Sequence, residues 1–137
     1  MNEFVLDASV ALSWFFIDEG DPYAAGVLER LLEHEAVVPP VWPLEVANGL
    51  LVAERRRRAT VAQTSQAMEQ LRYLPIHIDE GFTMERLEMV VALARAQMLS
   101  CYDAAYLELA IRGGLPLASM DEKLIAAAES CGVSRFT

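Results

Sequence analysis

Short apolar runs of the β type alternate with longer segments of helical spacing along the whole chain. The β-type runs lie at residues 4–6, 36–38, 75–78 and 117–119, and a weaker candidate for an edge strand lies at 133–136. Such alternation is typical of an α/β fold with a parallel sheet. We therefore expect a sheet of four to five short strands flanked by helices, in one domain over residues 1–137.

Capping residues and glycines mark the expected helix boundaries. Asp21-Pro22 has the form of a helix start, and Gly113-Gly114 has that of a helix stop. Together with the spacing of apolar residues, these signals predict helices over about 9–16, 21–32, 43–55, 60–73, from 83, 100–112 and 121–131. The same spacing predicts core-facing positions for Leu28, Leu32, Leu44 and Leu51.

The chain is acidic, with 20 Asp and Glu residues against 11 Lys and Arg and a net charge of −9. Taken alone, this charge disfavours a nucleic-acid partner, because phosphate contacts need positive charge. The objection weakens if some of the acids bind divalent cations, which would cancel part of the charge. Any contact with RNA must then be local.

We expect a cytoplasmic protein without a membrane partner. The longest apolar stretch, residues 8–17, is too short to cross a bilayer. The N-terminus has no basic region before an apolar one, as a secretory signal would have. Cys101 and Cys131 lie far apart in the sequence and in no Cys-x-x-Cys pair, which suits a reducing compartment.

Four acidic residues follow the predicted strands or open the predicted helices. Asp7 ends the first strand, and Asp121 comes two residues after the fourth. Glu45 and Asp103 each lie in the first turn of a later helix. Functional groups of parallel α/β folds gather beyond the carboxyl ends of the strands. We therefore expect these four side chains to meet there.

Each of these acids also has a local role open to it. Asp7 and Asp121 could be N-caps, Ser100-x-x-Asp103 has the form of a capping box, and Glu45 is placed to interact with a helix dipole. Asp7 and Asp103, however, lie in strongly apolar stretches of sequence, where a carboxylate needs a partner. That context favours a shared site over four separate caps.

Four carboxylates that meet repel one another, and a divalent cation relieves the repulsion. Ligands that are all oxygen favour Mg²⁺, Mn²⁺ or Ca²⁺ over zinc. His34 and His77 are the only histidines and the cysteines are unpaired, which argues against a structural zinc site. Carboxylate-bound Mg²⁺ keeps several waters, one of which can attack a phosphodiester.

The segments that hold these acids are Val5-Leu6-Asp7-Ala8-Ser9, Pro43-Leu44-Glu45-Val46-Ala47-Asn48, Tyr102-Asp103-Ala104-Ala105-Tyr106-Leu107 and Leu117-Ala118-Ser119-Met120-Asp121. In this order, and over nearly the whole chain, they resemble the motifs of the PIN-domain family, in particular the VapC-type toxins of bacterial toxin–antitoxin pairs. The resemblance implies a PIN-like three-layer fold and a Mg²⁺- or Mn²⁺-dependent endoribonuclease. It also implies a homodimer and neutralisation by a small antitoxin protein.

The resemblance also assigns residues. The family's catalytic, metal-binding acids carry over onto Asp7, Glu45, Asp103 and Asp121, and a small hydroxyl residue of its last motif carries over onto Ser119. From their positions, Ser9 and Asn48 could orient the carboxylates or bound waters, since Asn48 lies one turn beyond Glu45. For Ser9, a local backbone hydrogen bond is the alternative.

The only basic run and the aromatic residues have two interpretations each. Arg55, Arg56, Arg57 and Arg58 form either an RNA phosphate-binding patch or a helix end that complements the dipole. The aromatic side chains could stack on bases, but such residues more often belong to a core or a protein interface. They are Trp14, Phe15, Phe16 and Trp42.

Other functions fit less well. A receiver domain needs an acidic pair after the first strand, but here Asn2 and Glu3 precede it and Asp7 stands alone. A phosphatase of the haloacid-dehalogenase type needs Asp-x-Asp at this place, but position 9 is serine. A PIN-like module that binds protein or RNA without cleavage remains open, although four retained acids argue against it.

Overall fold

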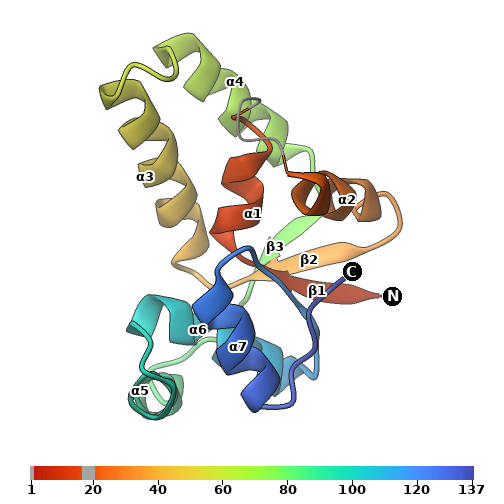
Figure 1. Cartoon of the computed structure of the whole chain (residues 1–137), viewed down its shortest axis with the longest axis vertical. Coiled ribbons are helices and arrows are strands. Elements are labelled where there is room, and N and C mark those ends of the chain that lie inside the picture. Colours follow the sequence, from red (N-terminus) through yellow and green to blue (C-terminus); the bar gives the residue numbers. More distant parts are fainter. Residues whose placement is uncertain (1, 17–20) are drawn as a thin grey trace.

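The computed structural model describes residues 2–16 and 21–137 (Figure 1). At its centre lies a four-stranded parallel sheet with the strand order β3-β2-β1-β4. The strands are β1 (Glu3–Leu6), β2 (Glu35–Val38), β3 (Ile76–Ile78) and β4 (Leu117–Ala118). The α/β class with a parallel sheet, predicted from the alternation of elements, is confirmed.

Helices cover both faces of the sheet and make a three-layer fold (Figure 1). On one side lie α1 (Ala8–Ser13), α2 (Pro22–Arg30), α3 (Trp42–Arg55) and α4 (Val61–Arg72). On the other side lie α5 (Arg86–Gln97), α6 (Cys101–Gly113) and α7 (Glu122–Ser130). Among the residues described, no helix is long and apolar enough to cross a membrane.

The core forms around β1, which lies between β2 and β4. Its run Phe4-Val5-Leu6 is fully buried, as expected for a strand that is covered on both faces. From α6, the side chains of Tyr106, Leu107 and Ala110 are fully buried as well. The helix α6 packs against β1 and β4, the two strands that precede Asp7 and Asp121.

Several predicted boundaries differ from the structure. The first helix ends at Ser13 and continues only as a turn, in which the indole of Trp14 donates to the carbonyl of Ala24 at 2.8 Å. The helix predicted from position 83 begins at Arg86. The edge strand predicted at 133–136 is reduced to one parallel bridge to Leu117, because β4 itself has only two residues to pair with.

The predicted core faces of α2 and α3 are wrong in part. Leu32 is 89% exposed because α2 ends at Arg30, and Leu28 is exposed too. Leu44 is 72% exposed, and Leu51 is also exposed. Apolar residues occur on more than one face of α3, and the face that the fold buries consists of Trp42, Val46, Leu50 and Ala53.

Candidate active site

The carboxyl ends of β1 and β4 meet where the strand order reverses. From β1 the chain proceeds to β2 and β3 on one side, and then returns to β4 on the other side. Such a switch point opens a crevice beyond the two strand ends. Asp7 follows β1 directly, and its N–H donates to the carbonyl of Ala118 in β4 at 2.9 Å. Asp7 and the segment 119–121 after β4 therefore lie side by side.

Asp7 occupies the N-cap position of α1 without acting as a cap. Its side chain makes no capping hydrogen bond and is buried. Instead, Oδ2 accepts hydrogen bonds from the hydroxyls of Ser9 at 2.7 Å and Ser119 at 2.8 Å. The capping role considered for Asp7 is therefore excluded. Because both bonds fall on Oδ2, Oδ1 has no hydrogen-bond donor among the residues described.

Ser9 and Ser119 also tie together the two segments that carry acids. The Ser9 hydroxyl accepts from the N–H of Met120 at 3.2 Å, and the Ser119 hydroxyl accepts from the N–H of Asp121 at 3.0 Å. The bond from Met120 replaces the local backbone bond considered for Ser9. Each hydroxyl thus donates to Asp7 and accepts from the segment after β4, which fixes the Asp7 carboxylate relative to Asp121.

Asp103 and Asp121 are both tied to helix N-termini. Asp121 is a true N-cap of α7, because its Oδ1 accepts from the N–H groups of Lys123 at 2.9 Å and Leu124 at 3.2 Å. Ser100 caps α6 by accepting from the N–H of Asp103 at 3.1 Å. The predicted capping box is only half formed, since the Asp103 carboxylate is not bonded to the backbone N–H of Ser100.

Glu45 has a partner that the sequence interpretation missed. It lies in the first turn of α3, and its Oε1 accepts from the hydroxyl of Tyr106 at 2.5 Å. Tyr106 is fully buried and lies three residues after Asp103, on the same face of α6. The available signal was its place in the Tyr-Asp-Ala-Ala-Tyr motif, since a buried tyrosine hydroxyl needs a hydrogen-bond partner.

The pKa values of Asp7, Glu45 and Asp103 are raised by burial and by neighbouring carboxylates. Burial raises the pKa of Asp7, and the negative charges of Asp103 and Asp121 raise it further, against the lowering effect of the two serine hydroxyls. Burial also raises the pKa of Glu45, with added repulsion from Asp7 and Asp103. For Asp103, burial and then the charge of Asp121 raise the pKa. Bringing these carboxylates together is therefore costly without a cation.

The donor set fits a hard divalent cation by its chemistry. All four candidate ligands are carboxylates, which suit Mg²⁺ or Mn²⁺. In residues 2–16 and 21–137, however, no three acidic, histidine or cysteine side chains converge tightly enough to chelate an ion as they stand. Coordination partly through water, which is usual for Mg²⁺, or rotation of the half-buried carboxylates of Glu45, Asp103 and Asp121 is needed to complete such a site.

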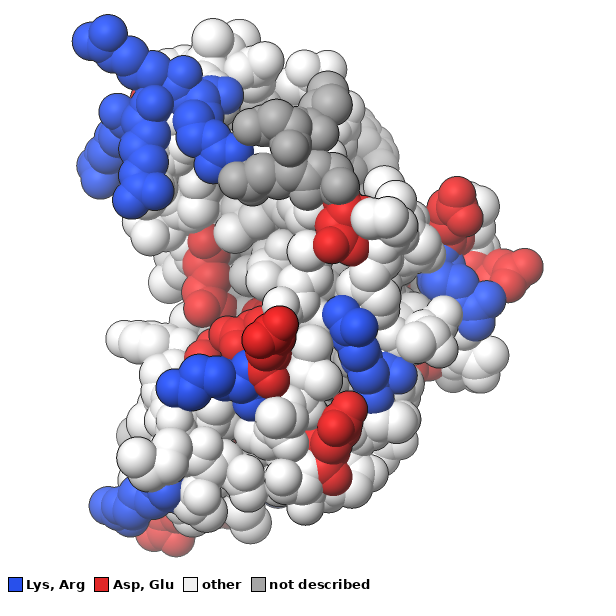
Figure 2. Space-filling model, viewed as in Figure 1, with Lys and Arg blue, Asp and Glu red and all other residues white. Residues whose placement is uncertain are grey.

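Two other predicted groups are exposed. Asn48 lies one turn after Glu45 in α3, but its side chain has no hydrogen bond to the residues described, so it does not hold the carboxylates in this structure. The arginine run, Arg55–Arg58, is exposed at the connection between α3 and α4, which projects away from the sheet. Figure 2 shows Lys and Arg side chains gathered over this connection, and acidic side chains near the middle of the same face.

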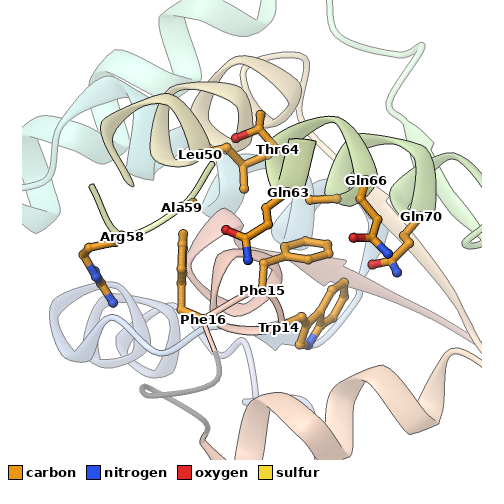
Figure 3. Close-up of a pocket in the computed structure, with 11 residues that line it drawn as sticks. Trp14, Phe15, Phe16, Leu50, Arg58, Ala59, Gln63, Thr64, Gln66 and Gln70 are labelled. Atoms are coloured by element: carbon orange, nitrogen blue, oxygen red, sulfur yellow. The ribbon is translucent and has the colours of Figure 1, made fainter. Parts of the chain in front are cut away.

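The aromatic residues are either buried in the core or packed against it. Trp42 is buried in the core. Trp14, Phe15 and Phe16 are half-buried and line a cavity of about 610 Å³ between the end of α1 and α4 (Figure 3). The cavity wall from α4 carries the amides of glutamines, and the guanidinium of Arg58 lies 5.0 Å from the ring centre of Phe16. This cavity is separate from the acidic residues.

Comparisons with known proteins agree with this arrangement. The PIN domain family matches residues 4–130. The chain is 31% identical over 128 residues to Ribonuclease VapC3 of Mycobacterium tuberculosis, in strains CDC 1551 / Oshkosh and ATCC 25618 / H37Rv, with 92% of this chain and 88% of that protein covered.

Two solved structures are similar in fold. The crystal structure of PAE2754 from Pyrobaculum aerophilum matches with a TM-score of 0.70 and 22% identity, over 95% of this chain and 86% of that one. A toxin–antitoxin complex from Klebsiella pneumoniae matches with a TM-score of 0.65 and 20% identity, over 90% of each chain.

Proposed function

The chain belongs to the PIN-domain family, and on that premise we propose that it is a Mg²⁺- or Mn²⁺-dependent endoribonuclease, the toxin of a VapBC-type toxin–antitoxin pair. The observation that carries this proposal is the burial and hydrogen bonding of the Asp7 carboxylate. It is buried at the end of β1, makes no cap, and is held by Ser9 and Ser119 beside the charges of Asp103 and Asp121. A fold that needed only a cap there would not bury a repelling carboxylate.

Each acid has its own part in the proposed mechanism. A divalent cation held by these carboxylates would offset negative charge on the scissile phosphate of RNA and would lower the pKa of a bound water, which favours loss of its proton. Asp7, oriented by two hydroxyls on Oδ2, offers Oδ1 as a ligand. Glu45, oriented by Tyr106, offers its other oxygen, Oε2. Asp103 and Asp121 open α6 and α7 and complete the oxygen set.

The arginine run supplies the local positive charge that an acidic ribonuclease needs. With a net charge of −9, the chain has no general attraction for RNA. Arg55–Arg58 lie on the same face as a group of acidic side chains (Figure 2), so we assign them to phosphates of the RNA strand beyond the scissile bond. This interpretation is preferred to a plain helix end because three of the four arginines lie beyond the last residue of α3.

Two protein partners belong to the proposal. We expect a homodimer in isolation, supported by the exposed leucines Leu44 and Leu51 on α3. We expect a small antitoxin that places a basic side chain among the acids, where it would compete with the cation. Light scattering tests the dimer, which a monomer at micromolar concentration would contradict. Mn²⁺ titration of the complex tests the antitoxin, since undiminished affinity would place inhibition elsewhere.

The proposed activity is tested by incubating purified protein with RNA in Mg²⁺ or Mn²⁺, and again in EDTA. Internal cleavage that requires the metal is the expected result. The control is Asp7→Asn prepared in the same way, which excludes a contaminating nuclease. Binding of RNA without cleavage under every metal condition would instead support the alternative of a PIN-like binding module.

A further inference from the structure

The segment after α7 is anchored beside the candidate site. Leu117 in β4 donates its N–H to the carbonyl of Ser134 at 3.0 Å and accepts from the N–H of Phe136 at 2.8 Å. The ring of Phe136 stacks on Phe4 of β1, with ring centres 3.9 Å apart and planes within 3° of parallel. These contacts place Arg135, which lies between the two anchoring residues, next to the segment that follows β4.

Two hydrogen bonds hold the Arg135 side chain against the backbone of Ser119. Its Nε and Nη2 both donate to the Ser119 carbonyl, at 3.2 Å and 2.9 Å. The guanidinium carbon lies 3.7 Å from the ring centre of Tyr23 in α2, within the range of a cation–π contact. The Tyr23 hydroxyl donates to the carbonyl of Phe136 at 2.7 Å, so Tyr23 is itself tied to the same segment.

We propose that Arg135, held by Tyr23, is a positioning residue of the metal site and acts through Ser119. The carbonyl of Ser119 receives Arg135, while its hydroxyl donates to Oδ2 of Asp7 and accepts from the N–H of Asp121. One residue thus transmits the position of Arg135 to two of the four carboxylates. The inference rests on the proposed function, because it concerns the geometry of that same metal site.

The contacts of Arg135 differ from those that stabilise the fold. Its side chain is exposed, whereas the neighbours Val133 and Phe136 are buried in the core. Loss of the guanidinium therefore leaves core packing intact and frees the Ser119 backbone. Arg30 provides a matched comparison, because it is also exposed and lies over an aromatic ring, at 5.8 Å from the centre of Phe136, but is not bonded to Ser119.

The test is a Mn²⁺ titration of the full chain, followed by steady-state RNA cleavage. Arg135→Ala is expected to weaken Mn²⁺ binding about tenfold, the lower end of the effect of removing a residue that supports metal ligands. Its kcat should fall while KM for RNA stays unchanged. Arg135→Lys, which can donate only one of the two hydrogen bonds, should fall in between. Arg30→Ala should match the wild type.

The outcomes separate the positioning role from its alternatives. Wild-type Mn²⁺ affinity in Arg135→Ala, while the wild type itself binds Mn²⁺, overturns the positioning role alone. A raised KM for RNA with unchanged Mn²⁺ affinity also overturns it and makes Arg135 an RNA contact. Absence of Mn²⁺ binding to the wild type overturns the proposed metal site together with this inference. If Arg135→Ala fails to fold, Arg135→Lys decides by the same criteria.

Discussion

The acids at the carboxyl edge of the sheet and the arginines at the α3–α4 connection are held in opposite ways. Asp7 is buried and fixed by two hydroxyls, and Glu45 is fixed by Tyr106. Arg55–Arg58 are exposed and lie at the end of a projecting helix pair. Fixed charges that are shielded from water can stabilise the charge that develops at one reacting phosphorus centre. Exposed charges instead attract a polyanion over a distance, and salt screens them.

This difference explains how both regions can serve one acidic protein. The acids would repel RNA if they stayed uncompensated, and their raised pKa values show the cost of gathering them. A cation reverses the sign of the local field. The arginines can bind phosphate without a cation, because they are themselves positively charged. Substitutions in the two regions should therefore alter different quantities: the rate at the acids and the salt dependence at the arginines.

The largest effect is expected at Asp7. Asp7→Asn keeps the size and a hydrogen-bond acceptor for Ser9 and Ser119 but removes the ligand charge, so cleavage should fall by at least about a hundredfold. Initial rates on RNA in Mn²⁺ measure this. Asp21→Asn is the matched control, because Asp21 is an N-cap of α2 outside the site, and it should cleave normally. Full activity in Asp7→Asn would show that Asp7 is not a metal ligand of the active site.

A smaller loss is expected at Tyr106. Tyr106→Phe deletes the hydroxyl that orients Glu45, without changing the core, and should lower cleavage about tenfold. Tyr73→Phe is the control, since Tyr73 also donates to a glutamate, Glu69 at 3.1 Å, but is exposed on the surface. Equal rates in the two variants would show that orientation of Glu45 is unimportant.

At the arginines, the expected change lies in salt dependence. Replacing Arg55 and Arg56 with Gln should weaken RNA binding and reduce the slope of log affinity against log salt by about 1.4, or about 0.7 for each phosphate that is no longer neutralised. Arg72 and Arg95, two exposed arginines on α4 and α5, give a control pair with the same change in charge. If both pairs change the slope equally, the α3–α4 connection has no special role and is only a helix end.

The smallest effect concerns the metal-free protein and its pH dependence. The pKa of Asp7 is raised in the folded state, so the folded protein holds this proton more tightly than the unfolded chain does. The free energy of unfolding therefore falls as pH rises from about 4 through the raised pKa, and it recovers as pH falls. Asp7→Asn cannot ionise and should therefore melt a few degrees higher than the wild type at neutral pH in EDTA. Thermal melts across this pH range measure the difference, which should vanish near pH 4. A lower melting temperature at neutral pH would contradict it.

Local signals predicted most of the fold. The caps Asp21 and Thr60 and the stop at Gly114 act within a few residues, and the structure has helix ends at all three. The buried face of α3 could not be chosen in the same way. Leucine and valine occur around much of that helix, so only the position of the sheet determines that Val46 is buried while Leu44 is exposed.

The positions of the acids were predictable, and so was a role of Ser9 in orienting a carboxylate, whereas the support of Glu45 by Tyr106 was not. Parallel strands direct their carboxyl ends to one edge, so Asp7 and Asp121 could be placed from the sequence alone. Tyr106 meets Glu45 across 61 positions in sequence, and Tyr23 meets the segment after α7 across 113. Such pairs depend on how whole layers pack, so the Tyr-Asp-Ala-Ala-Tyr motif indicates that a buried Tyr106 needs a partner but not which residue provides it.

The most direct test of the central claim, that the four carboxylates form one metal site, is the thermal stability of wild type and Asp7→Asn with and without Mn²⁺. Only the folded chain gathers these ligands, so Mn²⁺ at about 100 times its dissociation constant should stabilise the wild type by about 2.7 kcal/mol. Asp7→Asn should show little stabilisation at the same concentration. Equal stabilisation of both proteins would contradict the claim and place the metal away from Asp7.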